Sequence, residues 1–321
     1  MSDPFRTRDH VPDFDRHVAD YAARSAATRA RLPMRADIAY GPSPAERLDL
    51  FLPPPDRATG AVHMFIHGGY WRMFAKEDFS FVAETVTQAG AIAAIVDYAL
   101  MPAVRMETIV AQVRRACGWI VQNIGALGGD PAQLTISGHS AGAHLAALLL
   151  DESQPPGRIS GALLLSGIYE LGPLQGSFLK ELIAITDEEV ARFSPARRGY
   201  GRGPVVCLMV GEGETAPFHQ QAAAFTAQLT QAGVNARHAV IAGADHMSIV
   251  ADLGTPGTEA ARRLARCLAV VRLRPTADSA QAEKTARPCR PRLSSFVLVR
   301  SAPARLATAS RSMSAKGRLT Q

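Results

Sequence analysis

The stretch that decides the fold runs from Leu134 to Leu150 and reads LTISGHSAGAHLAALLL. It opens with a β-branched run, places Ser140 between Gly138 and Gly142, and continues as an Ala- and Leu-rich segment. This order predicts a buried strand, a tight turn and a buried helix. The glycines leave room for a sharp turn that holds the serine in a strained backbone conformation, with its hydroxyl above the strand ends. We therefore interpret Ser140 as a candidate nucleophile.

Length and composition limit the class of protein. The 321 residues, 47% of them hydrophobic, are enough for one large α/β domain or two small ones. No apolar run approaches the roughly 18–20 residues that a membrane span requires, and the charged start of the chain shows no cleavable apolar segment. We expect a soluble, cytoplasmic protein without a membrane partner. The four cysteines are widely separated, contain no C-x-x-C pair and lie near no histidine cluster, so inert thiols and no metal site are predicted.

The net charge of +6 would suit a polyanionic partner, but the charge is concentrated in one segment. Residues 272–321 hold 11 Lys and Arg against 2 Asp and Glu, which leaves 24 against 27 for residues 1–271. The segment is rich in Arg, Ala, Ser and Pro and is predicted to be a disordered basic tail. It contains no interleaved stacking aromatics, so we expect no nucleic-acid partner.

Strands and helices alternate along the chain before that tail. Apolar runs predict strands, besides the one before Ser140, at residues 61–65, 91–96, 159–165, 204–210 and 236–242. Periodic apolar spacing predicts helices at residues 11–36, 78–89, 106–124, 218–232 and 258–271. A hairpin at a sheet edge is expected from residues 37–40 and 46–52. The pattern predicts one α/β domain over residues 1–271, with a mostly parallel sheet, helices on both faces, and functional residues beyond the carboxyl ends of the strands.

Residues 168–203 interrupt this alternation with an irregular mixture of large apolar and polar side chains. A short helix is expected at residues 187–193, before a Ser-Pro break. We predict that this insertion forms a small lid over a pocket. The glycine-rich run at 198–203 has some likeness to a phosphate loop, but a strand rather than a helix follows it, so we interpret it as a flexible loop.

Among the histidines that follow Ser140 in the chain, one is placed to act as a base. A serine hydroxyl is a weak nucleophile unless a base lies within hydrogen-bond reach and a third group orients that base. His144 would point into the helix packing, and His219 opens a helix. His246 instead lies in a glycine-containing loop after the last predicted strand, and is therefore the predicted base.

The acid that orients the base is expected in the loop after the preceding strand. That loop offers two glutamates, Glu212 and Glu214, and no aspartate. Glu214 lies further beyond the strand end, where a carboxylate can accept the imidazole N–H, so we prefer it. Glu212 stays an alternative.

The motif HGGYW follows the strand predicted at 61–65. Glycines let backbone N–H groups approach a substrate closely, so the amides of Gly68 and Gly69, with that of Ala141, are predicted to form an oxyanion hole. Tyr70 and Trp71 would add an aromatic wall that suits a flat substrate, although burial would explain them equally well.

With these residues in place, the chain resembles the α/β-hydrolase superfamily, and more narrowly its kynurenine formamidase (arylformamidase) and esterase group. The likeness covers roughly residues 10–255. It is carried by the segments IHGGYW at 66–71, VDYAL at 96–100, GHSAGAHLAALLL at 138–150, LSGIYEL at 165–171 and ETAPFHQQ at 214–221. The acid of that group is usually an aspartate, where this chain has Glu214.

The resemblance implies hydrolysis of N-formyl-L-kynurenine to L-kynurenine and formate through Ser140, Glu214 and His246. It implies a small-molecule substrate and no metal or organic cofactor. A carboxylesterase for short acyl esters would use the same residues, and the sequence leaves that alternative open, as it does a homodimer. A non-catalytic, ligand-binding member of the fold would be favoured only if a triad residue were missing, and none is.

Overall fold

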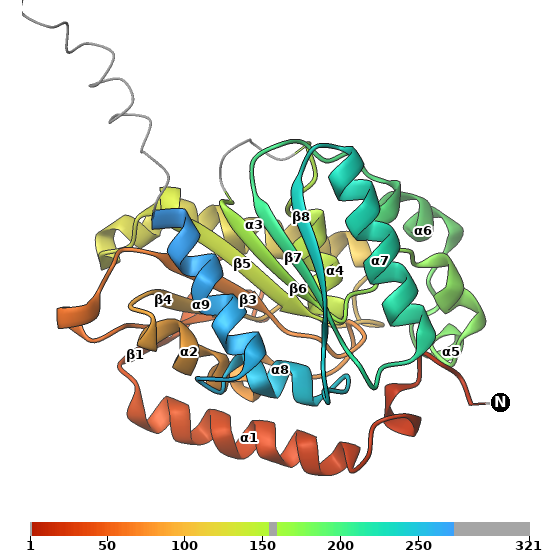
Figure 1. The fold of residues 1–321 in the computed structure, drawn as a ribbon, viewed down its shortest axis with the longest axis horizontal. Coiled ribbons are helices and arrows are strands. Elements are labelled where there is room, and N and C mark those ends of the chain that lie inside the picture. Colours follow the sequence, from red (N-terminus) through yellow and green to blue (C-terminus); the bar gives the residue numbers. More distant parts are fainter. Residues whose placement is uncertain (1, 154–158, 273–321) are drawn as a thin grey trace, which may run out of the picture. The chain divides into compact units, whose positions relative to one another are not determined.

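The computed structural model describes residues 2–153 and 159–272, and within them one sheet of eight strands forms the centre (Figure 1). The strands are β1 (Met34–Ala39), β2 (Arg47–Phe51), β3 (Val62–Ile66), β4 (Ile92–Val96), β5 (Leu134–His139), β6 (Gly161–Leu165), β7 (Val205–Gly211) and β8 (Asn235–Ile241). Their order in the sheet is β1-β2-β4-β3-β5-β6-β7-β8. Strand β2 pairs antiparallel with β1 and β4, and every other neighbouring pair is parallel. The predicted α/β fold with an edge hairpin is confirmed.

Helices cover both faces of the sheet. One face carries α3 (Met106–Asn123), α4 (Ala141–Leu148) and α7 (Ala216–Gln231). The other carries α1 (Phe14–Arg31), α2 (Ala83–Gln88), α8 (Ser248–Leu253) and α9 (Glu259–Arg272). In Figure 1, α9 crosses in front of β5 and β6, and α4 packs against the same two strands from behind.

The central strands are buried throughout, which explains their continuous apolar runs. Every residue of β3, β4 and β5 is buried, as expected for parallel strands covered on both faces. Alternate side chains of β3 enter different cores: Val62 and Met64 pack with α3 and α4, whereas Phe65 packs on the side of α1 and α8. This two-sided burial fixes the register and brings the carboxyl ends of the strands to one edge.

The helix predicted at residues 78–89 differs from the observed structure. The segment at 78–89 is a 3₁₀ helix at Lys76–Val82 followed by the short α2, rather than one continuous helix. Phe79 and Phe81 are both buried and pack their rings against Tyr21 of α1 at centroid distances of 5.5 and 5.2 Å. The segment therefore has no single apolar stripe, because its aromatic side chains fill a cluster rather than one helix face.

The insertion at 168–203 contains two α-helices, α5 (Lys180–Ile183) and α6 (Asp187–Phe193), and the second confirms the short helix expected at 187–193. Thr186 and Glu189 form a capping box at the start of α6. Glu189 also pairs with Arg105, the residue before α3. These contacts attach the insertion to the side of α3.

Among the described residues, no helix is long and apolar enough to cross a membrane. The predicted basic tail lies outside the described residues except for Arg272, which ends α9. Cys207 and Cys267 are free thiols, and burial raises the pKa of Cys267 to about 12. Cys289 lies in the part of the chain that is not described.

Candidate active site

The turn between β5 and α4 places Ser140 at the edge of the sheet. Ser140 has φ 54° and ψ −118°, a left-handed conformation that costs a non-glycine residue about 1–3 kcal/mol. The neighbouring glycines make this turn possible through close approach. A Cβ on Gly138 would lie 2.2 Å from the carbonyl oxygen of Gly142, and a Cβ on Gly142 would lie 2.0 Å from that of Ile66. The strained serine therefore depends on both glycines.

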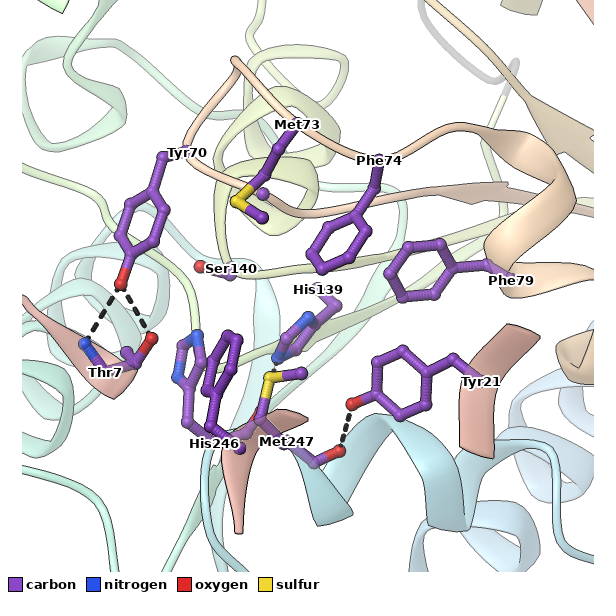
Figure 2. A pocket seen from close by; sticks show the side chains of 12 residues that line it. Thr7, Tyr21, Tyr70, Met73, Phe74, Phe79, His139, Ser140, His246 and Met247 are labelled. Atoms are coloured by element: carbon purple, nitrogen blue, oxygen red, sulfur yellow. Dashed lines mark hydrogen bonds between the residues drawn. The ribbon is translucent and has the colours of Figure 1, made fainter. Parts of the chain in front are cut away.

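The structure brings His246 and Glu214 together at the same edge. Nδ1 of His246 lies 2.7 Å from Oε2 of Glu214, and the Glu214 side chain has no exposed surface. A carboxylate only accepts hydrogen bonds when ionised, so Nδ1 carries the proton in this contact. His246 and Ser140 line one cavity, and Figure 2 shows both side chains on the same side of it.

The two candidate acids lie in different surroundings. The side chain of Glu214 is buried on His246, whereas Glu212 is exposed and accepts a hydrogen bond from the backbone N–H of Gly243 at 2.9 Å. Glu212 is thus exposed to solvent although it lies in the same loop as Glu214. The geometry favours Glu214 over the alternative.

A contact that the sequence reasoning missed lies on the far side of Glu214. Its Oε1 accepts hydrogen bonds from the Ser166 hydroxyl at 2.5 Å and from the backbone N–H of Gly211 at 2.7 Å. Ser166 directly follows β6, so its position beyond a strand end was the available indication.

His139 is a second buried imidazole beside His246. Its Nε2 lies 2.7 Å from the carbonyl oxygen of His246 and must donate, because a carbonyl only accepts. Burial, and to a lesser degree the nearby His246, holds the pKa of His139 well below its ordinary value. A neutral His139 therefore fixes the backbone of the His246 loop without adding charge.

The glycine loop after β3 lies against the nucleophile turn. A Cβ on Gly68 would lie 3.2 Å from the Cβ of Ser140, and Gly69 has φ +103°, where a Cβ would lie 2.3 Å from the carbonyl oxygen of Met73. No backbone hydrogen bond between described residues uses the N–H of Gly68 or Gly69. Ala141, the third predicted donor, is the first residue of α4. The three predicted oxyanion-hole residues thus surround Ser140.

The cavity at Ser140 is small and mostly apolar. It encloses about 20 Å³, room for about one water molecule. Figure 2 shows aromatic and thioether side chains around it, among them those of Tyr21, Met73, Phe74, Phe79 and Met247. A ligand larger than water requires part of this wall to move.

Tyr70 and Trp71 differ in their position relative to the cavity: Tyr70 lines it and Trp71 does not. Tyr70 lines the cavity, and its hydroxyl lies 2.7 Å from Oγ1 of Thr7 (Figure 2). The same hydroxyl donates to the carbonyl oxygen of Phe5 at 2.8 Å. Trp71 is fully buried and donates its indole N–H to Nδ1 of His144 at 3.2 Å. Within the described residues, Trp71 is absent from the cavity lining, so the structure favours burial, the alternative explanation, for this residue.

The cover of the cavity differs from the predicted lid. Within the described residues, 168–203 supplies no side chain to the cavity, and the N-terminal segment supplies Thr7 instead. This segment is held by Thr215, whose hydroxyl donates to the carbonyl oxygen of Pro4 at 2.6 Å. The insertion contributes indirectly, because the N–H of Phe178 donates to Asp3 at 2.5 Å and its ring packs on Tyr70.

His144 and His219, two further histidines that follow Ser140, lie elsewhere. His144 is fully buried, accepts from Trp71 and donates from Nε2 to the carbonyl oxygen of Phe193 at 2.7 Å. Burial lowers its pKa to about 4. His219 lies in α7 and is partly exposed.

The family model for the alpha/beta hydrolase fold matches residues 63–250, and the chain belongs to this family. It is an enzyme that hydrolyses amide or ester bonds. The chain is 31% identical over 248 residues to kynurenine formamidase of Danio rerio, covering 74% of this chain and 83% of that protein.

Two further likenesses accompany this one. The chain is 28% identical over 243 residues to isoprenylcysteine alpha-carbonyl methylesterase of Arabidopsis thaliana, covering 67% of this chain and 57% of that protein. Among solved structures, a proposed thioesterase from Silicibacter sp. TM1040 superimposes with a TM-score of 0.73 at 25% identity, over 84% of this chain and 98% of that one.

Proposed function

We propose that this enzyme hydrolyses N-formyl-L-kynurenine to L-kynurenine and formate through Ser140, Glu214 and His246. The observation that carries the proposal is the 2.7 Å contact between Nδ1 of His246 and the buried carboxylate of Glu214, beside a strained serine. The likeness to a kynurenine formamidase over 74% of the chain supports this substrate.

The contact with Glu214 sets the tautomer of His246. With the proton on Nδ1, the neutral imidazole has its lone pair on Nε2, where it can take the proton of Ser140. The carboxylate then stabilises the imidazolium that forms. Because Glu214 is shielded from water, this attraction is weakened less by solvent than an exposed pair would be.

The reaction then follows from the placement of the donors. Oγ of Ser140 attacks the formyl carbon while His246 takes its proton, and the amides of Gly68, Gly69 and Ala141 stabilise the oxyanion. His246 gives the proton to the departing aryl amine, which breaks the C–N bond and leaves a formyl ester on the serine. A water molecule, deprotonated by His246, attacks that ester, and formate leaves as the proton returns to Ser140.

The apolar, aromatic wall of the cavity supports a substrate with an aryl ring. A cavity of about 20 Å³ is too small for such a ring, so we propose that the cover over Ser140 moves when substrate enters. Tyr70 and the N-terminal segment are the groups that we expect to move, because Tyr70 and Thr7 line the cavity with Ser140 and hold each other by a hydrogen bond.

A carboxylesterase is the second candidate, and the likeness to a methylesterase favours it. The two candidates share the same chemistry and differ in the group that leaves. The test compares kcat/KM for N-formyl-L-kynurenine with that for p-nitrophenyl acetate, using the wild type and His246→Asn.

We expect the formamide to be hydrolysed at least as efficiently as the ester, and His246→Asn to lose about 10³-fold or more on both. A formamide turnover orders of magnitude below that of the ester would reject the formamidase proposal and leave the esterase. If His246→Asn kept the wild-type activity on both substrates, the assignment of His246 as the base would be rejected.

A further inference from the structure

The carboxylate of Glu214 is held at both oxygens. Oε2 faces His246, and Oε1 accepts from the Ser166 hydroxyl at 2.5 Å and the Gly211 N–H at 2.7 Å. The hydroxyl must be the donor, since an ionised carboxylate only accepts. Burial of a carboxylate is unfavourable unless hydrogen-bond donors replace its water, so the contacts on Oε1 offset part of the cost of burying Glu214.

Ser166 is tied to both the nucleophile and the acid. It is fully buried, has φ +52°, and its own N–H donates to the carbonyl oxygen of Met209 in β7 at 2.8 Å. The preceding residue, Leu165, accepts the N–H of Ser140 at 2.8 Å. The end of β6 therefore joins the serine turn on one side to the strand that leads to Glu214 on the other. A non-glycine residue at this φ is strained, so the surrounding structure holds it there.

We propose that Ser166 is a positioning residue that keeps Glu214 aimed at His246, an inference that rests on the proposed triad. A glutamate side chain has one more rotatable bond than an aspartate, so its carboxylate can swing away from the imidazole. Two donors on Oε1 oppose that rotation. Ser166 thereby lets a glutamate hold Nδ1 of His246 in its protonated form, which leaves Nε2 free to act on Ser140.

The test is a double-mutant cycle between Ser166→Ala and Glu214→Ala. The readouts are kcat and KM for p-nitrophenyl acetate, and the rate at which a fluorophosphonate probe modifies Ser140. Removing a hydrogen bond to a charged group predicts an about 10- to 100-fold lower kcat and labelling rate for Ser166→Ala, with KM within about twofold. In the Glu214→Ala background the same change should cost less than about twofold, because its partner is already gone.

Two variants keep this result interpretable. Ser166→Gly removes the hydroxyl at a φ that glycine adopts without strain, so it should fold and lose as much activity as Ser166→Ala. Ser137→Ala removes another fully buried serine hydroxyl, which contacts Nε2 of His63 at 2.7 Å in the adjacent strand, and should keep activity within about twofold. Equal losses from Ser166→Ala with and without Glu214 would show a purely structural role and overturn the inference, as would no loss.

The labelling readout separates this inference from the proposed substrate. The probe reacts with an activated serine whatever the natural substrate is, so the cycle keeps its meaning even if N-formyl-L-kynurenine is not hydrolysed. Rapid labelling of the wild type together with an unchanged rate for Ser166→Gly would overturn the role of Ser166 and leave the triad standing. A wild type that is not labelled at Ser140 would overturn both.

Discussion

Two parts of the site, its floor and its cover, are held in place by different kinds of contact. The floor of the proposed active site, which we define as Ser140, Glu214 and His246, stands on loops that follow three parallel strands of the sheet, β5, β7 and β8. The cover, defined as residues 3–11 and 69–74, is held by contacts between distant segments, such as the pair Thr7 and Tyr70, 63 residues apart, and the pair Pro4 and Thr215, 211 residues apart. The arrangement of the strands thus positions the floor residues, whereas contacts between individual side chains position the cover.

This difference predicts separate effects of mutation. Changes in the floor should reduce the rate of the chemical step, because its groups are held in one geometry by β5, β7 and β8. Changes in the cover should alter access to Ser140 and leave the chemistry largely intact.

The sharpest change in the floor is Glu214→Gln, compared with Glu212→Gln as a matched control. An amide at 214 can hold His246 in the wrong tautomer, and the corresponding change in a serine protease lowers kcat about 10⁴-fold. We expect a loss of about 10³- to 10⁴-fold in kcat for Glu214→Gln and less than about twofold for the exposed Glu212. Steady-state kinetics on p-nitrophenyl acetate measure both. A larger loss for Glu212→Gln would reverse the assignment of the acid.

Buried histidines near the floor predict a dependence of stability on pH. His144 has an ordinary pKa of 6.5, lowered by burial to about 4 in the folded protein. Below pH 6.5 His144 binds a proton in the unfolded chain, whereas in the folded protein it binds one only near pH 4. The free energy of unfolding therefore falls as the pH falls between these values. The slope is about 1.4 kcal/mol per pH unit for this group.

Urea titrations between pH 7 and 4 measure this slope. His144→Gln should be less stable at pH 7, because it loses buried contacts, but its stability should decline less steeply by about one proton. Gln112, a buried polar side chain that does not titrate, gives the control: Gln112→Ala should lower the stability and leave the slope unchanged. Parallel curves for the wild type and His144→Gln would contradict burial of a neutral imidazole at this position.

The cover is tested by Tyr70→Phe, which removes only the hydroxyl that contacts Thr7 and Phe5. Loss of these hydrogen bonds, each worth about 1 kcal/mol, predicts about tenfold faster amide exchange for residues 3–10. Hydrogen exchange followed by mass spectrometry measures it. The kcat for p-nitrophenyl acetate should change by less than about threefold, and a loss as large as that of Glu214→Gln would place Tyr70 in the floor instead.

The sequence predicted the sheet and the meeting of the floor residues for a shared physical reason. Apolar runs define parallel strands, and whatever follows their carboxyl ends is brought to one edge. Ser140, Glu214 and His246 each follow such a strand, so their order in the chain was enough to place them together. The same reasoning correctly set His144 apart as a core residue.

The cover could not be predicted in this way. The predicted lid at 168–203 attaches beside α3, and Trp71 is buried on His144, because both outcomes depend on side-chain packing between segments with no common periodicity. Ser166 was missed for a related reason. Ser166 lies in the segment LSGIYEL at 165–171, which resembles the formamidase and esterase group along its whole length. Only the hydrogen bond to Glu214 distinguishes Ser166 from its neighbours.

The proposed mechanism requires Ser140 as the nucleophile, and turnover of N-formyl-L-kynurenine by Ser140→Ala tests that most directly. Formate release should be measured for the wild type and for Ser140→Ala at equal concentration, with circular dichroism to verify that both are folded. We predict that the substitution lowers kcat by about 10⁴-fold or more, because no other group in the floor can form the formyl ester. A Ser140→Ala variant that retains a tenth or more of the wild-type rate would contradict the mechanism.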